Sequence, residues 1–305
     1  MNSPPGSSAG PAAWARLTPS VRGILWMLAA GLLFAALNAQ QKVLTHDMYP
    51  PQVVCLRYLT GSIILLPFAI HAGWAAYRPR RPGFMAVRSV FHAAGSMLWF
   101  IALPFVGLAE TSAIGFTGPI YMMLGASLFL GERMYAARWI AVLVAFAGVL
   151  IVLAPGLFAA GDSPAWALLL LVLCSPITSI SFLMSKVQTR VERPDAIVFW
   201  LGLLMTVLSL PFALIDWRWP TPVEWALLTS CGLIGSAAHY CMTRAFRIAD
   251  VGAVQSVRFV DLLYASLAGF LVFSHIPTVW TLAGGAVICG ATVWIARYES
   301  RRPHA

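Results

Sequence analysis

The residues that could do chemistry are ionisable side chains embedded in long apolar stretches. Asp261 lies in one such stretch, and Arg258 precedes it by three residues, so a helix would place both on one face. Ionisable groups inside a membrane cost about 3 kcal/mol or more unless they are paired or hydrated. The pair therefore indicates either a site for a charged ligand or a proton, or a self-neutralised structural pair that faces the interior of a helix bundle.

A second set of candidates forms one stripe of a helix. Arg88, His92, Gly95 and Trp99 follow one another at spacings of four, three and four residues, which brings them to the same helical face. His92 could take part in proton transfer, and Trp99 offers a ring on which a planar or cationic ligand could stack. Two structural alternatives stay open, because Arg88 could extend to the membrane surface and His92 could hydrogen-bond between helices.

Four further polar residues interrupt other apolar stretches. Arg57 and Tyr58 lie about two turns inside their segment, so Arg57 needs either an acid such as Asp261 or an anionic ligand group. Asn38 and His239 could each bind a ligand or hydrogen-bond to a neighbouring helix, and both alternatives stay open. All four are candidate binding residues.

The elements that must position these residues are transmembrane helices. Of the 305 residues, 60% are hydrophobic and only 10% are charged, whereas soluble domains carry about 25% charged residues. The mean hydropathy of +0.80 also indicates a chain that faces lipid. A span needs about 20 apolar residues, which predicts an all-α integral membrane protein of about ten transmembrane helices. The expected spans are 21–44, 51–74, 84–106, 110–130, 135–154, 165–187, 195–214, 223–244, 251–273 and 278–298.

The positive charges predict the orientation of the chain. With both ends inside, 15 of the 20 Lys and Arg residues fall in inside segments, two fall outside, and three lie within helices. This asymmetry predicts a multi-pass protein of the bacterial inner membrane with both termini in the cytoplasm. The charges are spread over several segments, which excludes a nucleic-acid partner. Residues 1–20 are rich in Pro, Gly and Ser and are expected to form a disordered tail.

The chain also repeats itself. A shift of 143 residues aligns Phe116 with Phe259 and Tyr121 with Tyr264, and it maps five expected spans onto five others. Because each half has an odd number of spans, the halves run in opposite directions through the membrane. We expect one repeat at 21–155, a second at 163–298 and a C-terminal tail at 299–305. Tyr121 and Tyr264, as repeat mates, are candidate walls of a central cavity.

Several short motifs in this order resemble a known family. The chain resembles the EamA-type repeat of the drug/metabolite transporter superfamily at residues 108–113 (LAETSA), 116–119 (FTGP) and 129–133 (FLGER). The resemblance continues at residues 243–246 (TRAF), Phe259 and Tyr264. The likeness covers nearly all of the chain after residue 20 and is closest to the branch of S-adenosylmethionine and riboflavin carriers. The chain departs from the family at Ser274-His275, where Gly-Glu is common, so a paired role for an acid in the second half is in doubt.

The resemblance implies a secondary active transporter of a small polar organic metabolite. The substrate would bind between the two repeats at mid-membrane, and access would alternate between the two sides. A flippase for lipids or lipid-linked precursors on the same fold is the alternative. No enzyme motif is found, and neither a cofactor nor a metal is expected. Expected partners are a small-molecule substrate and membrane lipids, with a proton or counter-substrate and a homodimer left open.

Glu132 raises a separate question at the end of an expected helix, next to Arg133 and Arg138. It could form a cytoplasmic salt bridge that locks one conformational state. It could equally form a surface ion pair worth less than about 1 kcal/mol.

Overall fold

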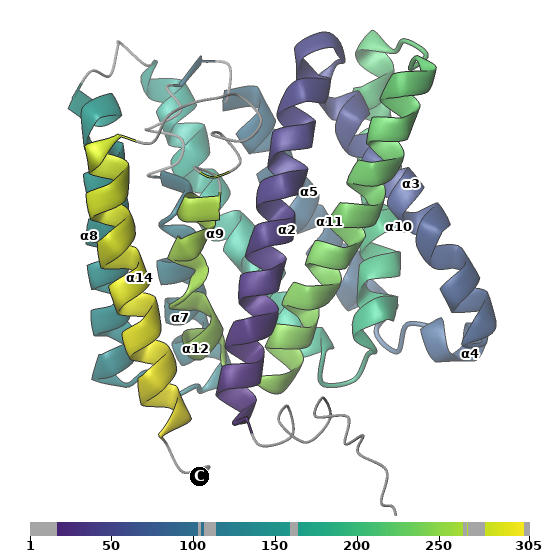
Figure 1. Ribbon diagram of the computed structural model, residues 1–305. Helices are drawn as coiled ribbons and strands as arrows, with labels where there is room; N and C mark the ends of the chain where they lie inside the picture. Colours follow the sequence, from purple (N-terminus) through teal and green to yellow (C-terminus); the bar gives the residue numbers. More distant parts are fainter. Residues whose placement is uncertain are drawn as a thin grey trace, which may run out of the picture.

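The computed structural model describes residues 17–102, 105–106, 114–158, 164–264, 267 and 278–301. The ordered elements in these ranges are all helical (Figure 1). The expected tails at 1–20 and 299–305 lie mostly outside the described residues. The helices are α2 (Pro19–Asp47), α3 (Pro50–His71), α4 (Trp74–Tyr77), α5 (Pro82–Ala102), α7 (Gly118–Leu130), α8 (Ala136–Phe158), α9 (Ala165–Gln188), α10 (Pro194–Ala213), η2 (Leu214–Asp216), α11 (Pro222–Ile248), α12 (Val251–Gln255), η3 (Arg258–Val260) and α14 (Val279–Ser300).

Local sequence signals explain where several helices begin and end. Thr18 caps α2 by accepting a hydrogen bond from the Val21 amide, and Thr221 and Glu224 form a reciprocal capping box at the start of α11. α7 ends at Gly131, which has a left-handed backbone with φ of 67°. Glycine adopts this conformation without a steric penalty.

Six of the described helices, namely α2, α3, α8, α9, α10 and α14, are long and apolar enough to cross a membrane. α5 and α11 have similar lengths of 21 and 27 residues, but they include the polar candidates Arg88, His92 and His239. Large apolar side chains cover the outside of the bundle, and Leu128 and Phe129 are 75% and 81% exposed. A lipid-facing surface accounts for this exposure.

The helices form two repeats of opposite direction. α2, α3, α5 and α8 correspond to α9, α10, α11 and α14, which begin 146, 144, 140 and 143 residues later. α2 begins at the lower end of the bundle in Figure 1, whereas α9 begins at the upper end. The most extensive helix contacts each join one repeat to the other: α2 with α11, α5 with α9, α3 with α10 and α8 with α14. A two-fold relation between inverted halves produces this pattern of contacts.

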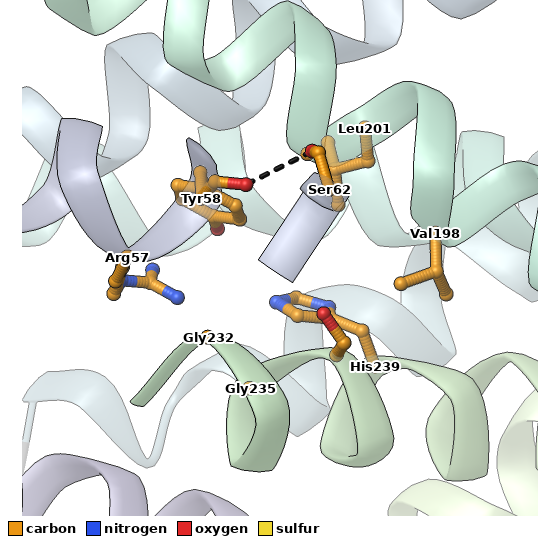
Figure 2. A pocket seen from close by; sticks show the side chains of 10 residues that line it. Arg57, Tyr58, Ser62, Val198, Leu201, Gly232, Gly235 and His239 are labelled. Carbon is orange, nitrogen blue, oxygen red and sulfur yellow. Dashed lines mark hydrogen bonds between the residues drawn. The ribbon is translucent and has the colours of Figure 1, made fainter. Parts of the chain in front are cut away.

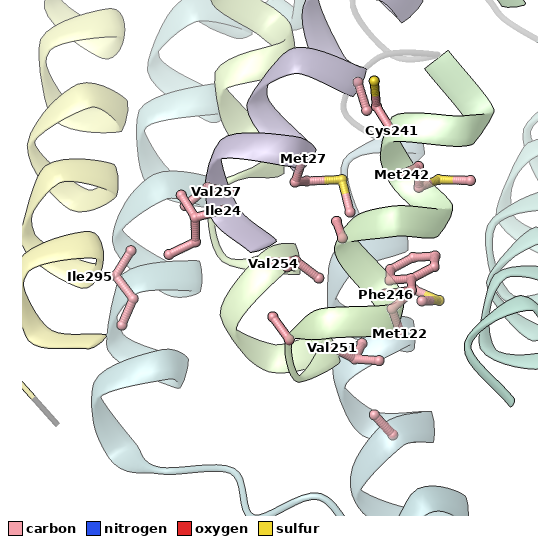
Figure 3. Packing of buried hydrophobic residues seen from close by; sticks show 14 of the residues in the cluster. Ile24, Met27, Met122, Cys241, Met242, Phe246, Val251, Val254, Val257 and Ile295 are labelled. Atoms are coloured by element: carbon pink, nitrogen blue, oxygen red, sulfur yellow. The ribbon is translucent and has the colours of Figure 1, made fainter. Parts of the chain in front are cut away.

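Small residues allow these helices to approach closely. A side chain at Gly284 in α14 would meet the carbonyl oxygen of Gly148 in α8, and one at Gly61 in α3 would lie 3.0 Å from the carbonyl oxygen of Gly232 in α11. Larger apolar residues fill the space between α2, α7, α11, α12 and α14 (Figure 3), including Met27, Met122, Phe246, Val254 and Ile295. The core therefore lies between the repeats.

The segment expected as one continuous span at 251–273 contains a break. α12 ends at Gln255, residues 256–257 form a turn, η3 follows, and residues 261–264 are again α-helical. Ser256 lies in this turn, and its hydroxyl donates a hydrogen bond to the carbonyl of Ala253 at 2.9 Å. Local bonds of this kind compete with the helical ladder. The described part of the expected span at 251–273 therefore contains a turn and a 3-10 segment between its α-helical parts.

The first repeat breaks at the equivalent place. Residues 114–115 are helical, 116–117 form a turn, and α7 follows. Thr117 donates a hydroxyl hydrogen bond to the carbonyl of Ile114 at 2.6 Å. The repeat mates Phe116 and Phe259 stack on each other, with ring centroids 6.1 Å apart and planes 27° apart. The two breaks thus meet at the pseudo-symmetry axis.

Ion pairs tie the repeats together at the end of the bundle where α2 begins and α14 ends, which we call the termini end. Arg138 of α8 donates to Glu299 of α14 at 2.9 Å and to Asp250 at 3.0 Å. Arg138 and Glu299 are almost fully buried, with side chains 2% and 3% exposed. This pair therefore crosses the repeat interface away from water.

Glu132 makes a second connection at the termini end. Its carboxylate accepts a 2.7 Å hydrogen bond from the Val251 amide and lies 3.8 Å from the Lys186 amine. Lys186 also donates to the carbonyl oxygens of Phe246 and Ala249. Burial raises the pKa of the Glu132 carboxyl, although Lys186 acts in the opposite direction. Glu132 is thus bound by the second repeat, and Arg138, which we considered as its partner, pairs elsewhere.

Candidate functional site

A hydrogen-bonded group of side chains lies where helices of both repeats meet. The Tyr58 hydroxyl is 3.1 Å from Nε2 of His92, and the Ser181 hydroxyl is 3.4 Å from Nδ1 of the same ring. Tyr58 belongs to α3 and His92 to α5, whereas Ser181 belongs to α9 of the second repeat. Both ring nitrogens of His92 are therefore engaged, so the orientation of this imidazole is fixed by two helices besides its own.

His239 of α11 completes this group. Its ring centroid is 5.8 Å from that of His92, 6.3 Å from that of Tyr58 and 5.1 Å from that of Phe34. The side chain is buried, and within the described part of the chain its Nδ1 atom has no hydrogen-bond partner. An unsatisfied polar atom in a buried site is costly, which makes His239 available to a ligand or a water molecule.

A pocket opens between α3, α10 and α11, and we call it the α3–α11 pocket. Figure 2 shows the Arg57 guanidinium and the His239 imidazole directed into the same space. Gly232 and Gly235 border it with bare backbone. α3 comes from the first repeat and the other two helices from the second. The full lining is Arg57, Tyr58, Ser62, Val198, Leu201, Gly202, Gly232, Gly235, Ser236 and His239.

Arg258 and Asp261 form an ion pair at the break of the second repeat. Nε and Nη2 of Arg258 both lie 3.3 Å from Oδ2 of Asp261, and the side chains are 24% and 20% exposed. The other oxygen of Asp261 occupies the space that a side chain at Gly31 of α2 would fill, and the Tyr264 ring lies 3.4 Å from that position. The spacing argument correctly placed Arg258 and Asp261 side by side.

Phe182 connects the ion pair to the histidine group. Its ring centroid is 5.7 Å from that of His92 and 5.9 Å from the guanidinium carbon of Arg258, within the range of a cation–π contact. A continuous series of five side chains therefore crosses the repeat interface, and we call this series the central chain. Its members are Tyr58, His92, Phe182, Arg258 and Asp261. This arrangement combines flat aromatic surfaces with hydrogen-bonding and charged groups.

Arg88 has a different environment from the central chain. Its side chain is 1% exposed, and it donates to the carbonyl oxygen of Ser181 at 3.3 Å and to Oε1 of Gln188 at 3.0 Å. Both partners belong to α9. Arg88 thus joins α5 to α9, and it extends neither to the membrane surface nor into the α3–α11 pocket.

The remaining candidates lie apart from the central chain. Asn38 is exposed on α2, Tyr121 is 36% exposed on α7, and Trp99 packs with an apolar cluster that includes Leu171. In the described ranges no hydrogen bond or ring contact joins these three side chains to His92. Their role in binding stays a prediction.

Phe182, Ser181 and Ser236 belong to the site but were not among the sequence candidates. Aromatic and hydroxyl residues are common in transmembrane helices as packing residues and interhelical hydrogen bonds, so their types alone gave no signal. The hydroxyl residues in the second half of α9 were the available clue for Ser181, because Ser175, Thr178, Ser179, Ser181 and Ser185 follow an apolar first half. Among the described residues, no three His, Cys, Asp or Glu side chains gather in a way that could hold a metal ion.

Known proteins resemble this chain in sequence. The sequence profile of the EamA-like transporter family matches residues 21–154 and, a second time, 165–297. A riboflavin transporter of Rhizobium johnstonii is 36% identical over 286 residues, with 93% of each chain covered. An S-adenosylmethionine uptake transporter of Rickettsia bellii is 27% identical over 279 residues, which cover 92% of this chain and 94% of the relative.

A solved crystal structure has the same fold. It superposes with a TM-score of 0.79 over 93% of this chain and 99% of its own length, at 21% identity. The two matched regions and the relatives confirm the resemblance and the all-α, two-repeat architecture predicted from the sequence. This chain is a multi-pass membrane protein and a transporter rather than an enzyme, and it belongs to the EamA-like transporter family.

Proposed function

We propose that this protein is a secondary carrier that binds a small polar organic metabolite at the central chain and moves it by alternating access. The supporting observation is that the central chain is assembled from both repeats. Tyr58 and His92 come from the first, and Phe182, Arg258 and Asp261 come from the second. A rocking movement of one repeat against the other would change this site, so binding and access would be coupled.

The substrate class is proposed to be a flavin or a similarly flat, polar molecule. The riboflavin transporters of Rhizobium johnstonii and Vibrio cholerae are 36% and 30% identical to this chain. The rings of Tyr58, Phe182 and His239 provide surfaces on which a flat ring system can stack. Hydroxyl and imidazole groups beside them could bind the polar edge and the hydroxylated tail of such a molecule.

The termini end is proposed to be cytoplasmic, because arginine and lysine residues concentrate there. In the present conformation Arg138 and Glu132 join the repeats at this end. Opening toward this side therefore requires the separation of both contacts, whereas they persist when the opposite side opens.

Transport by the purified protein in liposomes tests the proposal directly. The accumulation of radiolabelled riboflavin in protein-containing vesicles can be followed against protein-free vesicles. We expect saturable uptake that excess unlabelled riboflavin and close flavin analogues compete away. If the vesicles move no flavin and no other metabolite but scramble fluorescent phospholipids, the carrier proposal is wrong and a lipid flippase replaces it.

A further inference from the structure

Of the three arginines in or beside the central chain, only Arg57 has a side chain without a hydrogen-bonding or charged partner among the described residues. Arg88 donates to Ser181 and Gln188, and Arg258 is neutralised by Asp261. Within the described ranges, the Arg57 side chain makes neither a hydrogen bond nor an ion pair, and its Nε atom is buried without a partner. An uncompensated charge inside a membrane protein is costly and points to a function.

One side of the Arg57 guanidinium is left without a neighbouring side chain and faces the α3–α11 pocket, a space of about the size of one water molecule in this conformation. The guanidinium carbon stacks 3.9 Å from the centroid of the Tyr58 ring, so that face is covered. Gly235 of α11 lies close on another side, because a Cβ atom added to Gly235 would be 3.4 Å from Nη1 of Arg57. The N–H groups of Arg57 are directed into the α3–α11 pocket beside His239 (Figure 2).

The fixed charges around the central chain are unbalanced. Arg57, Arg88 and Arg258 contribute three positive charges and Asp261 one negative charge, so that two positive charges remain without counting the histidines. Charge interactions are stronger in a low-dielectric interior than in water. A ligand with a net positive charge is therefore repelled, whereas a neutral acceptor-rich or an anionic ligand is attracted.

We propose that Arg57 determines substrate specificity by donating to a pair of acceptor atoms on a neutral or anionic substrate, and that the site rejects net cations. A guanidinium presents its N–H groups as a planar fork that matches two neighbouring acceptors, such as a carboxylate, a phosphate or the carbonyl-rich edge of a flavin ring. The inference rests on the proposed carrier function and separates two substrate classes found among the relatives. Riboflavin is uncharged with an acceptor-rich edge, whereas S-adenosylmethionine carries a net positive charge.

Equilibrium binding to the detergent-purified protein tests the inference with three probes, namely riboflavin, its 5′-phosphate and S-adenosylmethionine. The variants are Arg57→Gln, Arg57→Lys and the control Arg247→Gln, which removes an exposed arginine at the end of α11. Hydrogen bonds to charged groups contribute about 1.5–3 kcal/mol, so Arg57→Gln should weaken flavin binding by about 10-fold or more. Arg57→Lys keeps the charge but loses the fork and should lie between Arg57→Gln and the wild type.

The expected result is binding of at least one flavin by the wild type and by Arg247→Gln, with S-adenosylmethionine bound at least about 10-fold more weakly. Unchanged flavin affinity in Arg57→Gln, or S-adenosylmethionine binding as tight as that of the flavins, overturns the inference and leaves the carrier proposal standing. Binding of none of the probes overturns the inference together with the proposed flavin class of substrate, whereas the carrier proposal as such is decided by the liposome assay. If Arg57→Gln elutes as a single peak in gel filtration and melts at the same temperature as Arg247→Gln, its weaker binding does not come from unfolding.

Discussion

Replacing Glu299 with alanine should strongly destabilise the termini end, because it strands a buried charge. Arg138 is 2% exposed and has two carboxylate partners, Glu299 at 2.9 Å and Asp250 at 3.0 Å. The Glu299 side chain is 3% exposed, whereas that of Asp250 is 54% exposed. Arg138 thus makes one buried ion pair, with Glu299, and one half-exposed ion pair, with Asp250. The half-exposed pair serves as a control for the buried one.

The two partners should differ in their contribution to stability. Loss of one member of a buried ion pair costs about 3–5 kcal/mol, since the other charge stays buried, whereas exposed pairs contribute about 0–1 kcal/mol. Because Asp250 still compensates part of the Arg138 charge in Glu299→Ala, we expect a loss of about 2–4 kcal/mol in unfolding free energy. Asp250→Ala should cost about 1 kcal/mol or less.

Thermal melting of the detergent-purified variants measures this difference. We expect the melting temperature of Glu299→Ala to fall several times further than that of Asp250→Ala. The double substitution Arg138→Met with Glu299→Leu removes both buried charges and should recover most of the loss, because apolar replacement of a buried pair is often neutral. Equal losses for the two single variants, or a double variant as unstable as Glu299→Ala, would refute the reasoning.

Substitutions at three further residues, two of them with a control variant, probe the site and the repeat interface. Gly31→Ala should displace Asp261 and reduce flavin transport severely, whereas Gly290→Ala, where a methyl group meets nothing within 4 Å, should leave transport unchanged. Tyr58→Phe removes the hydroxyl bound to the α5 imidazole and should weaken flavin binding about 3- to 10-fold, as titration of flavin fluorescence would show. Glu132→Ala leaves backbone amides of α12 without an acceptor and should lower the free energy of unfolding by about 1–3 kcal/mol, which a fall in melting temperature would show. Glu132→Gln should lower the free energy of unfolding by less.

Sequence reasoning predicted the helical architecture and the repeat because both depend on composition and spacing over long segments. It also predicted the Arg258–Asp261 pair, since a three-residue separation brings two side chains together on a helical turn regardless of the rest of the fold. Arg57 was expected to meet either Asp261 or a ligand. Asp261 pairs with Arg258 instead, and the ligand alternative is the one we develop.

The break at Ser256 in the second repeat was not predicted, for a physical reason. Although Gln255, Arg258 and Asp261 lie close to Ser256, the hydrogen bond that turns the chain there is local and short. Hydropathy averages over about 20 residues and does not resolve such a feature. Phe182 was missed for a related reason, because its contacts to His92 and Arg258 depend on how helices of the two repeats cross.

The symmetry of the scaffold contrasts with the asymmetry of its chemistry. Phe116 and Phe259 stack at the pseudo-two-fold axis, yet the repeat equivalents of Arg258 and Asp261 are glycines at 115 and 118. The second break thus supplies charge, whereas charge from the first repeat comes from Arg57 on α3 and Arg88 on α5. A substrate that contacts Arg57 and the Arg258–Asp261 pair together would bridge the two repeats. Such a ligand binds most tightly to the conformation in which these groups are closest, so its binding energy biases the rocking equilibrium on which transport depends.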